Sequence, residues 1–250
     1  MNVAIYQMAD RGDPLENLAR AYEAIVSTEA DFFILPELFV LPGGDYKKDY
    51  SVAEAYRETG KPGEGMLRKA SRGFAGYLIG GTLIEETADG YYNTCYVFRQ
   101  GELVVKYRKI NITQEEIDMQ LLPGDEIVTF PTEWGQAGLL VCCDICQDTT
   151  RDQVGARSDV VFFPVGMGVP NHPKVNGHPL SAEMAGKHKV AVVEVARVGF
   201  YDGQPLVTRS AVITPSGVIW EASEEGEDLA VVDVPLNSVA HGHSWGHPTQ

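Results

Sequence analysis

Three reactive side chains follow stretches that are typical of β-strands. Glu37 ends an apolar run, Lys109 follows a run rich in β-branched residues, and Cys142 lies near the end of a buried-looking run. A cysteine can attack an amide-like carbon, a carboxylate can carry its proton, and an ammonium can stabilise the oxyanion that forms. Together they predict a site for covalent acyl transfer. The three runs are 32–37, 103–109 and 138–144.

Each residue also has an ordinary structural explanation. Glu37 could cap a surface segment, Lys109 could be a solvated charge beside Lys106 and Arg108, and Cys142 could be packed in the core, as most free cysteines are. The functional interpretation is best supported for Cys142, because a thiol at a strand-to-helix turn meets backbone N–H groups and the positive end of a helix.

The cysteines and histidines do not form a recognisable metal motif. Three of the four cysteines lie within five positions, where Cys143 and Cys146 match C-x-x-C without the second pair that a zinc site needs. We therefore expect no metal and no cofactor. Such crowding is poor spacing for a disulfide framework, which favours a cytoplasmic location. His241, His243 and His247 are expected to form a polar tail.

Composition excludes several classes of protein. The chain has 250 residues, 44% hydrophobic and 22% charged, with a formal net charge of −15. That charge argues against nucleic acid or an anionic membrane as a partner. No stretch approaches the roughly 18 apolar residues of a membrane span, and residues 2–8 are predicted to form a strand rather than a signal peptide. With no linker or repeat, 1–250 is expected to be one domain.

Hydrophobic periodicity predicts an α/β fold, in which strands alternate with helices and several hairpins give a mixed sheet. Helices are expected at 14–30, at 61–75, after Cys142 and at 179–188, with a loop and a short helix between 41 and 61. Strands are expected at 2–8, 30–36, 77–85, 91–100, 102–107, 126–130, 137–142, 159–164 and 189–196, and as a hairpin over 207–221.

The order Glu37, Lys109, Cys142 in these contexts resembles the nitrilase superfamily of carbon–nitrogen hydrolases, in its amidase-like branch. The resemblance extends over nearly the whole chain, and the motifs are specific as an ordered set rather than singly. Further matching stretches are the opening strand with Gln7, the Pro-Gly turn at 122–125, and the segments 162–164, 196–199, 210–213 and 216–217.

The resemblance assigns roles to individual residues. Glu37 matches the general base, Lys109 the oxyanion-stabilising lysine and Cys142 the nucleophile. Cys143 follows the nucleophile, and its backbone N–H is expected to be a second oxyanion donor. The family has a further glutamate before the Pro-Gly turn, for which Glu116 fits the spacing slightly better than its neighbour at position 115.

The chain departs from the family pattern in two places. Residues 145–149 replace the arginine and Phe-Pro-Glu that often follow the acidic position, and Lys187-His188 replaces a Glu-Asn pair. These changes leave the three reactive residues intact. They bear on substrate class and on interface packing, which depend on the surrounding residues.

The resemblance implies a four-layer α-β-β-α sandwich of two mixed sheets flanked by helices, and pairing through the helical layers into a homodimer or higher oligomer. It implies hydrolysis of a small amide through a thioester. N-carbamoyl and nitrile hydrolases are alternatives within the family, although Asp144 replaces the Glu typical of the nitrile branch. A catalytically silent binding module and a cysteine-based metal or redox protein are the alternatives from other classes. Cations in loops 41–61 and 166–180 could recognise a substrate carboxylate: Lys47, Lys48, His172 and Lys174.

Overall fold

The fold is a computed structural model, which describes residues 1–43, 51–166, 178–201, 204–223 and 226–236. The C-terminal histidines and the four loop cations lie outside these ranges. Within the described residues, no helix has the length and apolar character needed to cross a membrane.

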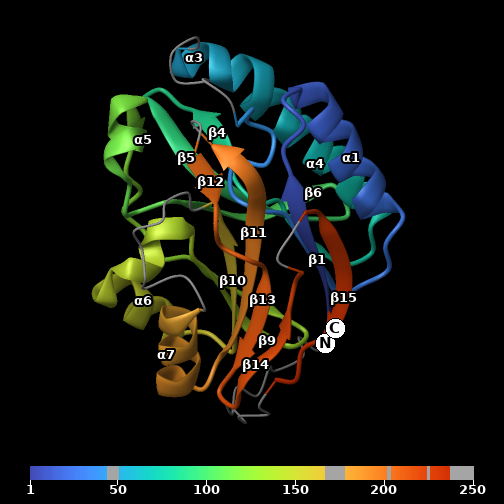
Figure 1. Ribbon diagram of the computed structural model, residues 1–250, viewed down its shortest axis with the longest axis vertical. Coiled ribbons are helices and arrows are strands. Elements are labelled where there is room, and N and C mark those ends of the chain that lie inside the picture. Colours follow the sequence, from blue (N-terminus) through green and yellow to red (C-terminus); the bar gives the residue numbers. More distant parts are fainter. Residues whose placement is uncertain (44–50, 167–177, 202–203, 224–225, 237–250) are drawn as a thin grey trace, which may run out of the picture.

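The strands form one curled sheet with two halves (Figure 1). The first half contains β1 (Asn2–Ala9), β2 (Phe32–Ile34), β3 (Tyr77–Ile79), β4 (Leu83–Glu86), β5 (Tyr91–Arg99), β6 (Glu102–Arg108), β7 (Leu121–Leu122) and β15 (Asp228–Asp233). The second half contains β8 (Thr129–Thr132), β9 (Gly135–Leu139), β10 (Val160–Val165), β11 (Ala191–Tyr201), β12 (Gln204–Leu206), β13 (Ala211–Thr214) and β14 (Gly217–Glu221).

Among the described residues, strand pairing joins the two halves only at the end of β1. There Met8 and Ala9 pair in parallel with Arg197 and Val198 of β11. Along the rest of that edge, residues 2–7 of β1 pair in antiparallel fashion with β15. Because the strands diverge from this junction, the halves can fold over one another and pack face to face.

Aromatic and aliphatic side chains fill the space between the two halves. The Phe32 ring of β2 lies 4.8 Å from the Phe162 ring of β10, measured between centroids. Val3 and Ile5 of β1 and Val193 of β11 belong to the same buried cluster. All six residues of β10 are buried, as expected for a parallel strand that is covered on both faces.

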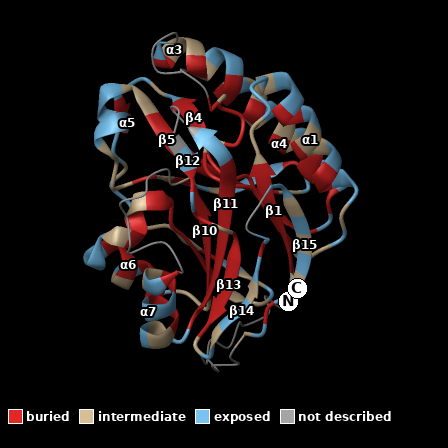
Figure 2. Ribbon diagram, viewed as in Figure 1, coloured by how far each residue is buried: buried red, intermediate tan, exposed pale blue. Residues whose placement is uncertain are grey.

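Helices cover both outer faces. Leu18 of α1 and Leu67 of α4 pack on the first half, while Val154 of α6 and Met184 of α7 pack on the second. Figure 2 shows buried strands between helices with exposed outer surfaces. The predicted four-layer α-β-β-α fold is confirmed. The helices are α1 (Pro14–Val26), α3 (Val52–Ala55), α4 (Lys61–Gly73), α5 (Gln114–Asp118), α6 (Asp148–Gly155) and α7 (Pro179–His188), with a π-helix η1 (Tyr56–Gly60) and a 3-10 helix η2 (Cys142–Cys146).

Several predicted boundaries need correction. The first helix ends at Val26, where Ser27 caps it, rather than at position 30. The strand expected at 77–85 is two strands, β3 and β4, because Gly81 adopts a φ of +57° and turns the chain. A Cβ at Gly81 would lie 2.1 Å from the Pro36 carbonyl oxygen, so only glycine fits there.

Candidate active site

The candidate residues meet because their strands run in the same direction. Strands β2 and β3 are parallel, and β5 is antiparallel to both β3 and β6, so β6 runs the same way as β2. Strand β9 is parallel to β10 and β11, and β11 is parallel to β1. Glu37, Lys109 and Cys142 therefore all follow strands that end at the same end of the sandwich.

Glu37 is held by a segment that leaves β2. Thr82 fixes this segment, since its N–H donates to the Pro36 carbonyl and its hydroxyl accepts from the Leu38 N–H at 2.9 Å. The Glu37 side chain is buried, with 5% of its surface exposed. Its Oε2 accepts a hydrogen bond from the Gly166 N–H at 3.0 Å, while Oε1 faces the ammonium of Lys109 at 3.0 Å. The carboxylate is thus fixed from two sides.

Lys109 connects two carboxylates. Its Nζ lies 3.0 Å from Glu37 Oε1 and 2.7 Å from Glu116 Oε2, and all three side chains are buried. Asn93 makes a second bridge, because its Nδ2 donates to Glu37 Oε1 at 2.9 Å and to Glu116 Oε1 at 2.8 Å. Buried charges need such pairing, since an unpaired charge in the interior is costly.

Glu116 is positioned by the short helix α5. Thr113 caps this helix: its hydroxyl accepts from the Glu116 N–H, and its own N–H donates to Glu116 Oε2 at 2.9 Å. This capping box orients Glu116 inward, while Glu115 is exposed. The structure therefore places Glu116, and not Glu115, beside Lys109.

Cys142 begins the 3-10 helix η2 with a φ of +48°, a conformation that non-glycine residues rarely adopt. The first hydrogen bond of this turn runs from the Asp144 N–H to the Val141 carbonyl. The N–H groups of Cys142 and Cys143 precede that bond, so neither has an acceptor inside the turn. They can bind an anion beside the thiol.

Asp144 holds the turn in place rather than facing the three reactive groups. Its Oδ2 accepts hydrogen bonds from the Tyr107 hydroxyl at 2.7 Å and the Val141 N–H at 3.0 Å. Its Oδ1 accepts from the backbone and side chain of Asn111. Because Tyr107 and Asn111 flank Lys109, Asp144 ties the cysteine turn to the lysine segment.

The electrostatics keep the lysine charged and the thiol neutral at rest. Contact with the Cys143 thiol, burial and the Glu37 charge raise the pKa of Cys142 well above its ordinary value, although the Lys109 ammonium opposes them. Burial alone would lower the pKa of Lys109, but Cys142 when it is ionised, together with the charges of Glu37 and Glu116, raises it well above its ordinary value. A thiolate therefore forms only when a nearby base accepts the proton.

The structure brings together Glu37, Lys109, Cys142 and Glu116, with Cys143 directly after Cys142 in the same turn. Sequence reasoning missed Asn93, which bridges both carboxylates. It also missed helix α5, although Thr113 and Glu116 have the Ser/Thr-x-x-Glu spacing that marks a helix start.

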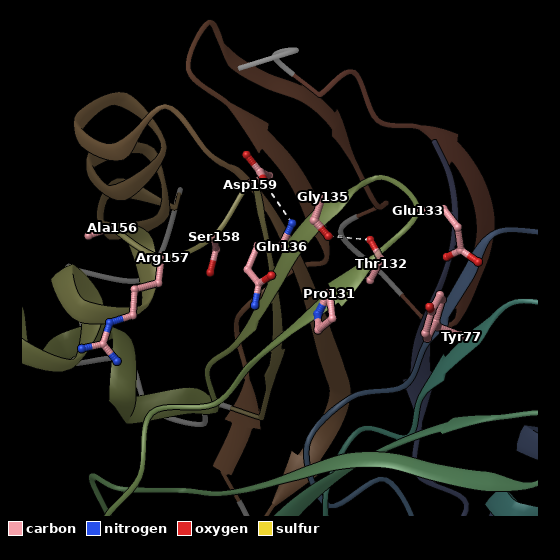
Figure 3. Close-up of a pocket in the computed structure, with 10 residues that line it drawn as sticks. All are labelled: Tyr77, Pro131, Thr132, Glu133, Gly135, Gln136, Ala156, Arg157, Ser158 and Asp159. Carbon is pink, nitrogen blue, oxygen red and sulfur yellow. Dashed lines mark hydrogen bonds between the residues drawn. The ribbon is translucent and has the colours of Figure 1, made fainter. Parts of the chain in front are cut away.

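A hollow of about 690 Å³ lies elsewhere (Figure 3). It is lined by Gly135 and Gln136, which begin β9, by Asp159, which precedes β10, and by Tyr77, which begins β3. These strands start at the hollow and end near the candidate site. The hollow is therefore at the opposite end of the sandwich from Cys142.

A family model described as carbon-nitrogen hydrolase matches residues 2–243. The chain belongs to the carbon–nitrogen hydrolase family. This confirms the resemblance on which the candidate residues were chosen. Family membership alone leaves the substrate open.

Curated relatives in this family include omega-amidases. The omega-amidase NIT2 of Mus musculus is 33% identical over 156 residues, which cover 57% of this chain and 55% of that protein. A hydrolase of Schizosaccharomyces pombe, C26A3.11, is 31% identical over 186 residues, covering 68% of this chain and 56% of that protein. The chain thus spans about half the length of the curated relatives it matches.

Solved structures share the fold of this carbon–nitrogen hydrolase. A cysteine-to-serine variant of the nitrilase-superfamily amidase from Nesterenkonia AN1 superposes with a TM-score of 0.80 at 23% identity, covering 94% of this chain and 92% of that one. At 23% identity, this structural similarity shows that the two proteins share a fold.

Proposed function

We propose that this protein is a cysteine-dependent amidase that hydrolyses a small amide through a thioester. The observation that carries the proposal is the buried set in which Lys109 bridges Glu37 and Glu116 beside Cys142. Such a set is costly to bury, and it provides a base, an oxyanion-stabilising cation and a nucleophile at one point. The same reaction class is supported by the relatives, which include an omega-amidase and an amidase.

Acylation uses the resting state described above. Glu37 takes the proton from the neutral Cys142 thiol, and the thiolate attacks the carbonyl carbon of the amide. The Lys109 ammonium and the Cys143 N–H stabilise the tetrahedral oxyanion. Glu37 then returns the proton to the leaving nitrogen, so that ammonia or an amine departs and the acyl group remains on sulfur.

Deacylation needs an activated water. Glu37 or Glu116 accepts a proton from water, which attacks the thioester carbon, and Cys142 leaves as the thiol. Both carboxylates share the Lys109 ammonium and the Asn93 amide, so a proton taken by one changes the hydrogen bonding of the other. In a solved structure of the Nesterenkonia amidase, the acetamide moiety of fluoroacetamide is covalently attached to the active-site cysteine.

Ammonia release from a panel of small amides, N-carbamoyl compounds and nitriles tests the proposal. The panel includes amides that carry a carboxylate elsewhere in the molecule and amides that carry none, because relatives are omega-amidases. We expect Cys142→Ala to lose about 10⁴-fold or more of the wild-type rate. Cys95→Ala is the matched control, since Cys95 is a buried core cysteine on β5 and should keep full activity.

The panel also separates the alternatives. Turnover confined to N-carbamoyl compounds or nitriles would replace the amidase proposal with one of the other reactions of the family. If no compound is turned over and Cys142 alkylates no faster than an ordinary thiol, the chain is a silent module with the same fold.

We further propose that the protein acts in the cytoplasm as a homodimer or higher oligomer. The location is supported by four cysteines that form no disulfide, as expected in a reducing compartment. The assembly is supported by the pairing of helical layers that family resemblance implies, here α6 and α7. Light scattering of the purified chain gives the oligomeric state directly. A monomer at micromolar concentration would refute the proposed assembly.

A further inference from the structure

The turn that carries Cys142 contains two more cysteines in a defined arrangement. In a 3-10 helix, residues i and i+3 are eclipsed, and a rise of about 2 Å per residue separates their Cα atoms by about 6 Å. Cys143 and Cys146 of η2 have this spacing. The separation lies inside the range of about 4.4–6.8 Å that disulfides require. The two thiols are therefore placed to be oxidised together.

The three cysteines follow one another along the turn. The Cys142 side chain interacts with that of Cys143, and the Cys143 side chain interacts with that of Cys146. Cys142 is buried, whereas Cys143 and Cys146 are partly exposed. None of the three forms a disulfide in the structure. If Cys142 is oxidised, the oxidation can therefore be passed to Cys143 and then to Cys146, which is more exposed than Cys142.

We propose that Cys143 and Cys146 are a resolving dithiol, which returns a peroxide-oxidised Cys142 to the thiol state. The co-reactant is a hydroperoxide. The inference rests on the proposed function, because it takes Cys142 as the reactive thiol of the site. It concerns residues that the amidase reaction does not use as side chains.

The first step oxidises Cys142. Its thiolate attacks one peroxide oxygen, so that an S–O bond forms and the O–O bond breaks, leaving a sulfenic acid and an alcohol or water. Glu37 removes the thiol proton for this reaction as it does for amide attack, and Lys109 stabilises the thiolate. The nucleophile is therefore exposed to oxidation in the same ionised state in which it is catalytic.

The next two steps transfer the oxidation. The Cys143 sulfur attacks the sulfenic sulfur and releases water. The Cys142–Cys143 disulfide that forms is strained and hence reactive, because Cα atoms joined by a trans peptide are about 3.8 Å apart, below the usual range for disulfides. The Cys146 thiolate then attacks Cys143 Sγ, forming a Cys143–Cys146 disulfide, and Cys142 leaves as a thiolate. In total, one hydroperoxide is reduced to an alcohol and water while two thiols become one disulfide. A cellular dithiol can reduce that disulfide.

Peroxide titration of the full-length reduced protein tests the proposal by mass spectrometry. With one equivalent of hydrogen peroxide, the wild type should lose about 2 Da, yield a Cys143–Cys146 linked peptide and keep Cys142 open to alkylation. Cys146→Ser should instead stop at the Cys142–Cys143 disulfide. Cys143→Ser should accumulate the sulfenic and then the sulfinic acid at Cys142, about 16 and 32 Da heavier. Cys95→Ser is the matched control and should behave as the wild type.

Activity provides a second readout. Cys146→Ser should match the wild type before oxidation, lose most of its amide turnover after peroxide, and recover it with dithiothreitol, while the wild type stays active. Sulfinic acid at Cys142 of the wild type, with no disulfide, would overturn the inference, as would equal inactivation of the wild type and Cys146→Ser. Failure of the reduced wild type on every amide would instead count against the proposed function, and the disulfide map would still report on the dithiol.

Discussion

At the scale of single residues, the site contains two carboxylates and one ammonium. Asn93 is a neutral group that donates hydrogen bonds to both carboxylates and so lowers the cost of burying them. Its Nδ2 donates one hydrogen to each carboxylate, and the side chain is 1% exposed. A hydrogen bond to a charged group contributes about 1.5–3 kcal/mol. Asn93 is therefore expected to position Glu37 and Glu116.

Replacing Asn93 with alanine should lower kcat/KM by roughly 10–100-fold, which corresponds to the loss of about one such hydrogen bond. Because a misplaced carboxylate slows the chemical step, the loss should appear in kcat rather than in KM. Steady-state kinetics measure both constants. Ser71→Ala is the control, since Ser71 is equally buried but its hydroxyl bonds to the Arg68 carbonyl and the Gly101 N–H, at the start of β6 and away from the site. An unchanged kcat in Asn93→Ala would show that Asn93 is only a packing residue.

The sequence predicts that the candidate residues Glu37, Lys109 and Cys142 lie together, but it does not reveal their partners. Glu37, Lys109 and Cys142 could be predicted because each follows a strand, and strand ends in a mixed sheet collect at one end. Asn93 lies within the alternating pattern of β5, and its partners are 56 and 23 residues away in the chain. No local signal distinguishes such a residue from an ordinary polar residue of a strand.

At the scale of elements, the Glu37 segment depends on how β3 and β4 are separated. Gly81 lies between them with a positive φ. The position that a Cβ would occupy on Gly81 is filled by the backbone of Leu35 and Pro36. That close approach lets Thr82 bond to Pro36 and Leu38 on either side of Glu37. The glycine therefore controls the position of the proposed base.

Gly81→Ala should reduce both stability and activity. The positive φ alone costs an alanine about 1–2 kcal/mol, and the contact with Pro36 adds to that cost by pushing the Glu37 segment away. Gly12→Ala is the matched control, since Gly12 has a φ of +77° and open space around it. We expect both variants to melt at lower temperature and only Gly81→Ala to lose turnover. Full turnover in Gly81→Ala would contradict this account of the segment.

Helix α7 begins at a buried histidine between two carboxylates. His178 lies 3.0 Å from Glu194 Oε2 through Nδ1 and 3.0 Å from Glu221 Oε1 through Nε2. Burial alone would lower its pKa, but the hydrogen bonds and charges of Glu194 and Glu221 raise it above the ordinary value of 6.5. The protonated ring opposes the helix dipole at this position, so the two carboxylates must provide the compensation.

Stability should depend on pH through His178. Since its pKa is higher in the folded than in the unfolded state, its contribution is fully present below about pH 6.5 and is lost as the pH rises through the folded pKa. Urea unfolding should show His178→Gln less stable than the wild type by about 1.5–3 kcal/mol near pH 6, and by less near pH 9. In a Glu194→Gln background the pH dependence of this difference should shrink. A difference that is the same at both pH values would exclude an ionised pair.

Elements with strong local signals were predictable, and those defined by long-range pairing were not. The span of α7, Pro179–His188, agrees with the prediction of 179–188, because an apolar pattern and an initial proline mark it. Strand β15 was missed, since its apolar residues Leu229 and Val231 point outward and are exposed. What makes it a strand is the edge of β1, which the local sequence does not reveal.

At the scale of the whole molecule, β1 and β15 close the sandwich. Strand β11 covers only the last two residues of one edge of β1, and β15 occupies the remainder. The pairing connects the two ends of the described chain, with the Met1 amino group 3.2 Å from Asp233 Oδ1. Because Val3 and Ile5 of β1 face the buried cluster between the sheets, losing β15 would expose the edge of a core strand.

Proline substitutions in β15 test this closure. The Val234 N–H donates to the Met1 carbonyl, and antiparallel bonds alternate, so the Ala230 N–H donates toward Ile5 and the Val231 N–H points away from β1. Ala230→Pro removes a ladder donor and leaves an acceptor of β1 unpaired, which costs about 1–3 kcal/mol and lowers the melting temperature by roughly 2–12 °C. Val231→Pro is the matched control on the outer edge, where proline is tolerated, and should cost clearly less. Equal melting temperatures for the two variants would show that β15 does not hold the sandwich closed.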